Sequence, residues 1–139
     1  MFKNVLFPVD QSREAREAAE VVANIVQKYG SRLFLLSVVE KPDPDAEAPT
    51  QETEPMMSPE KVAQLLKQAQ ALFANLGIET ETLTRSGMPA FTICDVADEI
   101  GADLIVMGCR GLGLTEEGAA ESVTNRVINL SPCPVLIVP

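Results

Sequence analysis

The residues best placed to do chemistry are a lone carboxylate near the amino terminus and a glycine cluster in the last third of the chain. Asp10 follows the apolar run 5–9, and three glycines fall within 108–113, after the apolar run 104–107. Glycine lets a backbone approach a ligand closely, and a helix amino terminus around 122–124 adds N–H donors and a positive dipole end. This combination suggests an anion site in which Asp10 accepts hydrogen bonds from a base amino group or a ribose hydroxyl.

The residue inventory argues against catalysis. The chain has no histidine, which removes Ser-His and Cys-His nucleophile pairs and histidine-ligated metals. Its three cysteines form no CxxC pair, a usage that favours a reducing compartment over a disulfide scaffold. We therefore expect a binding protein rather than an enzyme, with no catalytic residue and no metal site.

The charge balance limits the partners. Twenty acidic residues against eleven lysines and arginines give a formal net charge of -9, whereas nucleic-acid binding draws its affinity from clustered lysine and arginine. The first apolar run is too short for a signal peptide, and no stretch approaches the roughly 20 apolar residues that span a bilayer. We expect a cytoplasmic protein with no nucleic-acid or membrane partner.

Short apolar runs alternate with helical patterns along the whole chain. Right-handed crossovers between such strands predict a doubly wound, Rossmann-like α/β fold, a five-stranded parallel sheet with helices on both faces. The strands are expected at 5–9, 33–39, 78–84, 104–107 and 134–139, and the helices at 13–29, 59–76, 89–100 and through 123–130.

The position of the candidate site follows from the order of the strands. The run 33–39 is continuously apolar, typical of a central strand, whereas 78–84 alternates with glutamates, typical of an edge. The predicted order is 3-2-1-4-5, whose topological switch lies between the first and fourth strands, where open α/β sheets bind ligands. Asp10 and Gly108 to Gly113 are expected to face each other there. A tight strand-to-helix turn would use the same glycines, so this pattern alone leaves both interpretations open.

One segment departs from the rest of the chain in composition. Between Glu40 and Glu60 lie five of the ten prolines, and seven acidic residues stand against Lys41. Such a segment buries too little apolar surface to order itself. We expect a mobile acidic loop at about 40–57 within one domain that spans 1–139.

Four segments together resemble the universal stress protein family, and the likeness runs nearly end to end. In nucleotide-binding members the loop reads Gly, two residues, Gly, nine residues, Gly, then Ser or Thr, a pattern that Gly108, Gly111 and Ser122 fit. The resemblance implies a regulatory or protective stress-response protein that binds ATP or AMP without catalysing a reaction. The four segments are 5–10 (VLFPVD), 87–90 (GMPA), 102–113 (ADLIVMGCRGLG) and 131–138 (SPCPVLIV).

The resemblance also implies which residues bind the nucleotide, in two groups. Adenine and ribose would be lined by Val9, Asp10 and Val38, with Pro8 and Met107 in the same cofactor-binding set. The phosphates would be held by Gly108, Arg110, Gly111, Ser122, Val123 and Thr124.

Glu121 is the important departure from the family pattern, because it replaces the last loop glycine. A carboxylate about 4 Å from a phosphate charge costs on the order of 4 kcal/mol at an effective dielectric near 20, roughly a thousandfold in affinity. Three alternatives stay open: a glutamate that swings into solvent and permits binding, a nucleotide-free interaction module in which Glu121 blocks the phosphate site, and a weak ATP hydrolase.

The final strand suggests how the chain assembles. Val135 to Val138 would be the outermost strand, and an exposed apolar edge invites pairing with a second copy. The family resemblance implies a homodimer built through this strand.

Overall fold

The computed structural model describes residues 2–9, 13–40, 59–108 and 119–138, and within them five strands alternate with four helices. The predicted alternation is therefore confirmed over the described part of the chain. The elements are β1 (Asn4–Pro8), α1 (Arg13–Tyr29), β2 (Arg32–Glu40), α2 (Pro59–Asn75), β3 (Thr80–Gly87), α3 (Pro89–Ile100), β4 (Leu104–Gly108), α4 (Ala119–Leu130) and β5 (Val135–Val138).

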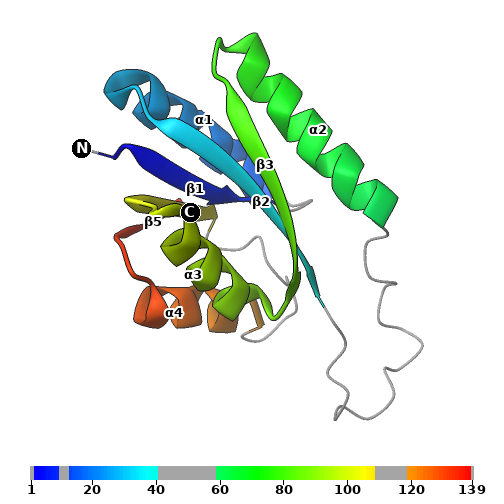
Figure 1. Cartoon of the computed structure of the whole chain (residues 1–139), viewed down its shortest axis with the longest axis vertical. Coiled ribbons are helices and arrows are strands. Elements are labelled where there is room, and N and C mark those ends of the chain that lie inside the picture. Colours follow the sequence, from blue (N-terminus) through cyan, green and yellow to red (C-terminus); the bar gives the residue numbers. More distant parts are fainter. Residues whose placement is uncertain (1, 10–12, 41–58, 109–118, 139) are drawn as a thin grey trace.

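All five strands lie parallel in one sheet, in the order β3-β2-β1-β4-β5 (Figure 1). This is the predicted doubly wound order. The strands predicted to be central are central: Val5 and Leu6 of β1 and Leu35 and Leu36 of β2 are fully buried. The chain builds outward from β1 to β3 on one side and then crosses to β4 and β5 on the other.

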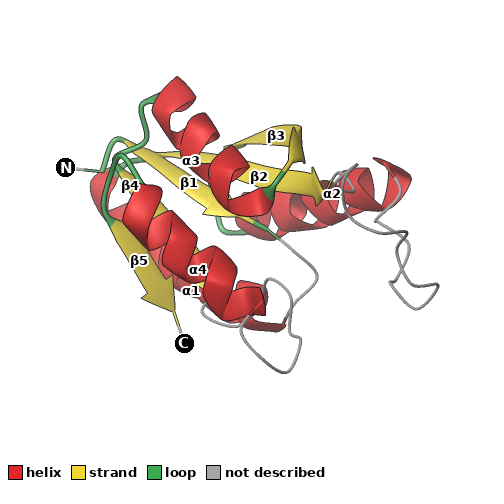
Figure 2. Ribbon diagram, turned by 90° about the horizontal axis from the view of Figure 1, so that it is seen from below, coloured by secondary structure: helices red, strands yellow, loops and turns green. Residues whose placement is uncertain are grey.

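Alternate residues of the central strands contribute to two apolar cores, one on each face of the sheet. Figure 2 shows that helices lie on both faces. On one face α1 and α2 pack over β1, and the rings of Phe7 and Phe73 meet edge to face with centroids 6.2 Å apart. On the other face α3 and α4 pack over Leu6, Phe34 and Ile105. Both faces are covered by helices, which explains why these strands are apolar without interruption.

The edge strand β3 begins at Thr80, two residues later than the sequence pattern predicts, and ends at Gly87. The amide of Ile78 donates to the carbonyl of Phe73, so Ile78 belongs to the turn that closes α2. Its side chain is buried in the core between the sheet and α1 and α2. An apolar residue was needed at this position for burial beneath the helices, not for the strand.

Asp103 ties the two central strands β1 and β4 together at their amino ends. Its carboxylate Oδ2 accepts the amide N–H of Lys3 at 2.8 Å and of Asn4 at 3.0 Å. Its own amide donates to the carbonyl of Asn4, also at 2.8 Å. The start of β4 is therefore held against the start of β1 by three hydrogen bonds.

Candidate functional site

The predicted ligand site lies at the opposite, carboxyl end of β1 and β4, where the pairing of the two strands stops early. Their register spans only Val5↔Leu104 and Leu6↔Ile105, although β1 continues to Pro8 and β4 to Gly108. On their other sides both strands stay paired to their last residues, β1 with β2 and β4 with β5. The two central strands are therefore unpaired with each other over their last residues.

Pro8 gives the physical reason for this early stop. The carbonyl of Asn4 accepts from Asp103 on the β4 side, whereas the amide of Val9 donates to Leu36 on the β2 side at 2.8 Å. Successive residues of a strand direct their backbone groups to opposite sides, so residue 8, like residue 4, faces β4. Proline has no N–H, and the ladder toward β4 loses its next donor at this position.

Three of the predicted nucleotide-binding residues share one face of the sheet. Val38 packs against the core beneath α3 and α4, to which Met107 belongs. Pro8 lies on this face too, because it alternates with Phe7 and Val9, which belong to the core of α1 and α2. The predicted residue Val9 therefore faces the other helix layer and is 7% exposed.

The rest of the predicted site lies wholly or partly outside the described residues. Gly108 is described and ends β4, whereas Asp10, Arg110 and Gly111 fall outside the described residues. Four further residues are described as backbone of α4 but not as side chains: Glu121, Ser122, Val123 and Thr124. The predicted face-to-face placement of Asp10 and the glycine loop stays a prediction.

The start of α3 also lies at this end of the sheet, although the sequence pattern predicted no site role for it. Gly87 pairs with Glu40 at the end of β2, and α3 begins two residues later, at Pro89. Met88 is the N-cap residue, makes no side-chain cap hydrogen bond and is 55% exposed. The signal that points to this turn is the Gly-Met-Pro sequence itself, in which glycine takes φ +150° and proline fits a first helical turn.

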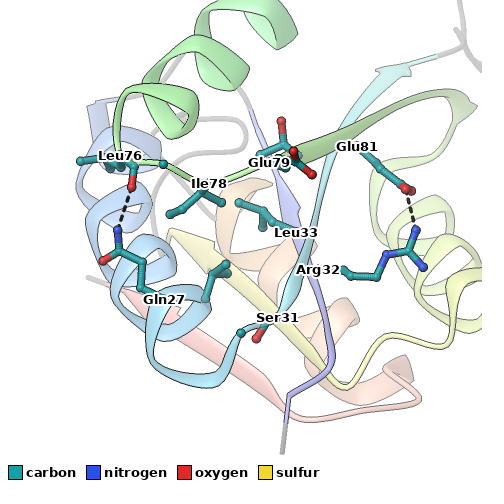
Figure 3. Close-up of a pocket in the computed structure, with 12 residues that line it drawn as sticks. Gln27, Ser31, Arg32, Leu33, Leu76, Ile78, Glu79 and Glu81 are labelled. Carbon is teal, nitrogen blue, oxygen red and sulfur yellow. Dashed lines mark hydrogen bonds and ion pairs between the residues drawn. The ribbon is translucent and has the colours of Figure 1, made fainter.

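A hollow of about 580 Å³ opens at the other end of the sheet, away from the predicted site (Figure 3). Its lining is mixed, with Val26, Leu33 and Ile78 beside polar residues, and it lies where α1 and α2 end and β2 and β3 begin. One side is closed by the hydrogen bond from Gln27 Nε2 to the carbonyl of Leu76 at 3.0 Å, and the other by the ion pair of Arg32 with Glu81 at 2.6 Å. None of the predicted nucleotide-binding residues lines it.

Of two thiols on the α3 and α4 side of the sheet, Cys94 is buried in the core and Cys133 packs against it, partly exposed. Burial raises the pKa of Cys94 and also that of Cys133 above the usual thiol range. Raised values keep both groups protonated near neutral pH, the opposite of an activated nucleophile. Among the residues that the structure describes, no three acidic, cysteine or histidine side chains gather as metal ligands. No helix in that same part of the chain is both long and apolar enough to cross a membrane.

The fold is that of a doubly wound α/β protein, whose topological switch lies between β1 and β4, the position at which proteins of this class bind ligands. The family model described as "Universal stress protein family" matches residues 1–139. A universal stress protein of Synechocystis sp., Sll1654, is 65% identical over 139 residues, which cover 100% of this chain and 87% of that protein. The chain belongs to the universal stress protein family.

Solved structures share the fold. A universal stress protein in complex with cAMP superposes with a TM-score of 0.77 at 24% identity, covering 99% of this chain and 97% of the other. A universal stress protein from Archaeoglobus fulgidus in complex with dAMP superposes with a TM-score of 0.72 at 22% identity, covering 99% and 98%. At these identities the likeness establishes the common fold.

Proposed function

We propose that this universal stress protein is a non-catalytic regulatory or protective protein that binds an adenine nucleotide, ATP or AMP, at the carboxyl ends of β1 and β4. The observation that carries the proposal is the early end of the β1 and β4 pairing at Pro8. It leaves the ends of β1 and β4 unpaired with each other at the topological switch, where α/β sheets of this kind bind ligands.

The shared face of the sheet supports an adenine at this position. Pro8, Val38 and Met107 present apolar surface toward the α3 and α4 side at adjacent strand ends, and an adenine ring needs an apolar wall of this kind. Relatives with the same fold have been solved with cAMP and dAMP, two ligands that share the adenine base. The phosphates would lie toward Gly108 and the start of α4, whose amide groups favour anions.

A second candidate rests on Glu121, which stands where the loop pattern has glycine. In this alternative the carboxylate blocks the phosphate site, and the protein is a nucleotide-free interaction module. Homodimerisation in the cytoplasm through Val135 to Val138 belongs to both candidates. β5 is the outermost strand and all four of its residues are partly exposed, which supports this assignment.

Calorimetric titration with ATP and AMP tests the proposal, with paired variants on β2. Val38→Asp places a carboxylate on the proposed adenine face, whereas Val39→Asp places one on the opposite face of the same strand, where Val39 packs against the α1 and α2 core. Val38→Asp is expected to weaken binding at least about tenfold, the equivalent of 1.4 kcal/mol, and Val39→Asp to weaken it much less. Equal losses from the two variants would remove the assignment of the adenine face.

Glu121→Gly separates the two candidates. If the wild type binds no nucleotide and Glu121→Gly binds it, the crevice is formed but blocked, and the interaction-module alternative stands. Binding by the wild type with an affinity equal to that of Glu121→Gly refutes the block. Absence of binding in both proteins refutes the nucleotide proposal as a whole.

A further inference from the structure

The sheet has two exposed edges of unequal length, and the longer one is β3. It runs over eight residues, against four in β5. A strand at the edge of a sheet presents unpaired N–H and C=O groups, which form a template for another chain. Unless other groups cover it, an edge strand of eight residues is therefore expected to pair with a second molecule.

The register shows which backbone groups of β3 point away from the sheet. The amide of Arg32 donates to Lys3, just before β1, and the carbonyl of Leu36 accepts from Val9, just after it. The even-numbered residues of β2 therefore direct their backbone groups toward β1, and the odd-numbered residues toward β3. Leu33 is such a residue, and it stands opposite Thr80. In a parallel ladder the residue opposite a bonded residue directs its own groups outward, which assigns the outward groups of β3 to residues 80, 82, 84 and 86.

Two of these four outward carbonyls are already occupied by side chains. Gln70 Nε2 on α2 donates to the carbonyl of Thr80 at 3.4 Å, and Arg85 Nη1 donates to the carbonyl of Thr84 at 3.1 Å. The second nitrogen of the guanidinium, Nη2, lies 3.3 Å from Glu99 Oε1 on α3. The helices on the two faces of the sheet thus each contribute to covering the same edge.

We propose that Gln70 and Arg85 block the β3 edge against pairing with a strand of a second copy of this chain. A new strand would need the carbonyls of Thr80 and Thr84 as acceptors, and it would have to displace both side chains. Glu99 acts as a positioning residue, because its carboxylate holds the Arg85 guanidinium beside the edge. The block leaves β5 as the edge open to self-association, so that assembly ends at closed particles instead of continuing through both edges.

The test removes both covering groups in the full chain. Sedimentation velocity of Gln70→Ala/Arg85→Ala is compared with the wild type at about 100 μM, within the range at which exposed strand edges associate. The weight-average mass is expected to rise at least about twofold over the wild type, because each newly paired edge joins two particles. The wild type serves as the reference whatever its own oligomeric state, so the result does not depend on the proposed dimer or on nucleotide binding.

Two further variants make the result specific. Lys67→Ala/Gln68→Ala removes one cation and one amide from exposed positions of α2, and its mass is expected to stay at the wild-type value. Thr82→Pro, added to Gln70→Ala/Arg85→Ala, removes an outward N–H without removing a bond to β2, and it is expected to restore the wild-type mass. An unchanged mass in Gln70→Ala/Arg85→Ala overturns the proposal, and so does a rise that Thr82→Pro leaves in place.

Discussion

The Asp103 carboxylate joins the amino ends of β1 and β4, so its removal should cost a measurable part of the free energy of unfolding. Asp103→Ala removes the acceptor of two amide groups, at 2.8 and 3.0 Å. A hydrogen bond to a charged group contributes about 1.5–3 kcal/mol. The bond from Lys3 is exposed to solvent, where water replaces part of the loss, so we expect a total loss of about 2–3 kcal/mol.

Urea unfolding followed by circular dichroism measures this loss. With a slope of about 2 kcal/mol/M, the midpoint is expected to fall by about 1–1.5 M. Asp103→Asn keeps an acceptor oxygen but not the charge, and it should lose about half as much. Asp98→Ala removes an exposed carboxylate from α3, and it should stay within about 0.5 kcal/mol of the wild type. A loss for Asp103→Ala no larger than that of Asp98→Ala would refute the role of this contact.

Two other expectations concern the start of α3 and the core beneath it. In Gly87→Ala the new Cβ lies 2.6 Å from Thr92 Oγ1, at a backbone φ of +150°, so we expect the free energy of unfolding in urea to fall by about 1–3 kcal/mol. Gly77→Ala is the control, because Gly77 has φ +78° and nothing lies within 4 Å of its new Cβ, so that its loss reports the backbone cost alone. Equal losses in the two variants would exclude the clash with Thr92. Because burial raises the pKa of Cys94 and Cys133, both should alkylate more slowly than free cysteine at about pH 8, as mapped by peptide mass spectrometry, and a rate equal to that of free cysteine contradicts this. The contribution of these two protonated thiols to the free energy of unfolding is fully present below the pKa that the thiols have in the unfolded chain. It is lost as the pH rises through their raised pKa values in the folded protein.

The order of the strands was predictable from the sequence because strands that are buried on both faces and strands at the edge of the sheet use different residue types. β2 is continuously apolar over Leu33 to Leu36, and these residues are all buried. The segment predicted as the third strand alternates with Glu79 and Glu81, and Glu81 lies in β3, exposed at the edge. Central and edge strands therefore differ in amino-acid composition, and the crossover rule supplies the rest of the order.

The early end of the β1 and β4 pairing was not predictable in the same way. Pro8 is visible in the sequence, but its effect depends on which neighbour residue 8 faces, and that is fixed by the register with Leu36 and Asp103. Whether Ile78 belongs to β3 or to the turn after α2 was equally hard to predict, because an apolar residue before Thr80 suits either a strand or a buried helix end. In both cases the deciding information is tertiary: it lies in the hydrogen-bond partner and not in the residue type.

The anchoring of β1 and β4 at one end only has a consequence for how this molecule tolerates change. The Asp103 carboxylate holds β1 and β4 together at their amino ends, and the pairing of the two strands ends before Pro8, toward their carboxyl ends. Substitutions at the carboxyl ends therefore act where the two strands are no longer paired with each other, and those at the amino ends act at the opposite end of the strands from the proposed nucleotide site. The free-energy effects of substitutions at the two ends should therefore add, so that a change at the proposed nucleotide site should leave the stabilising contribution of Asp103 unaltered.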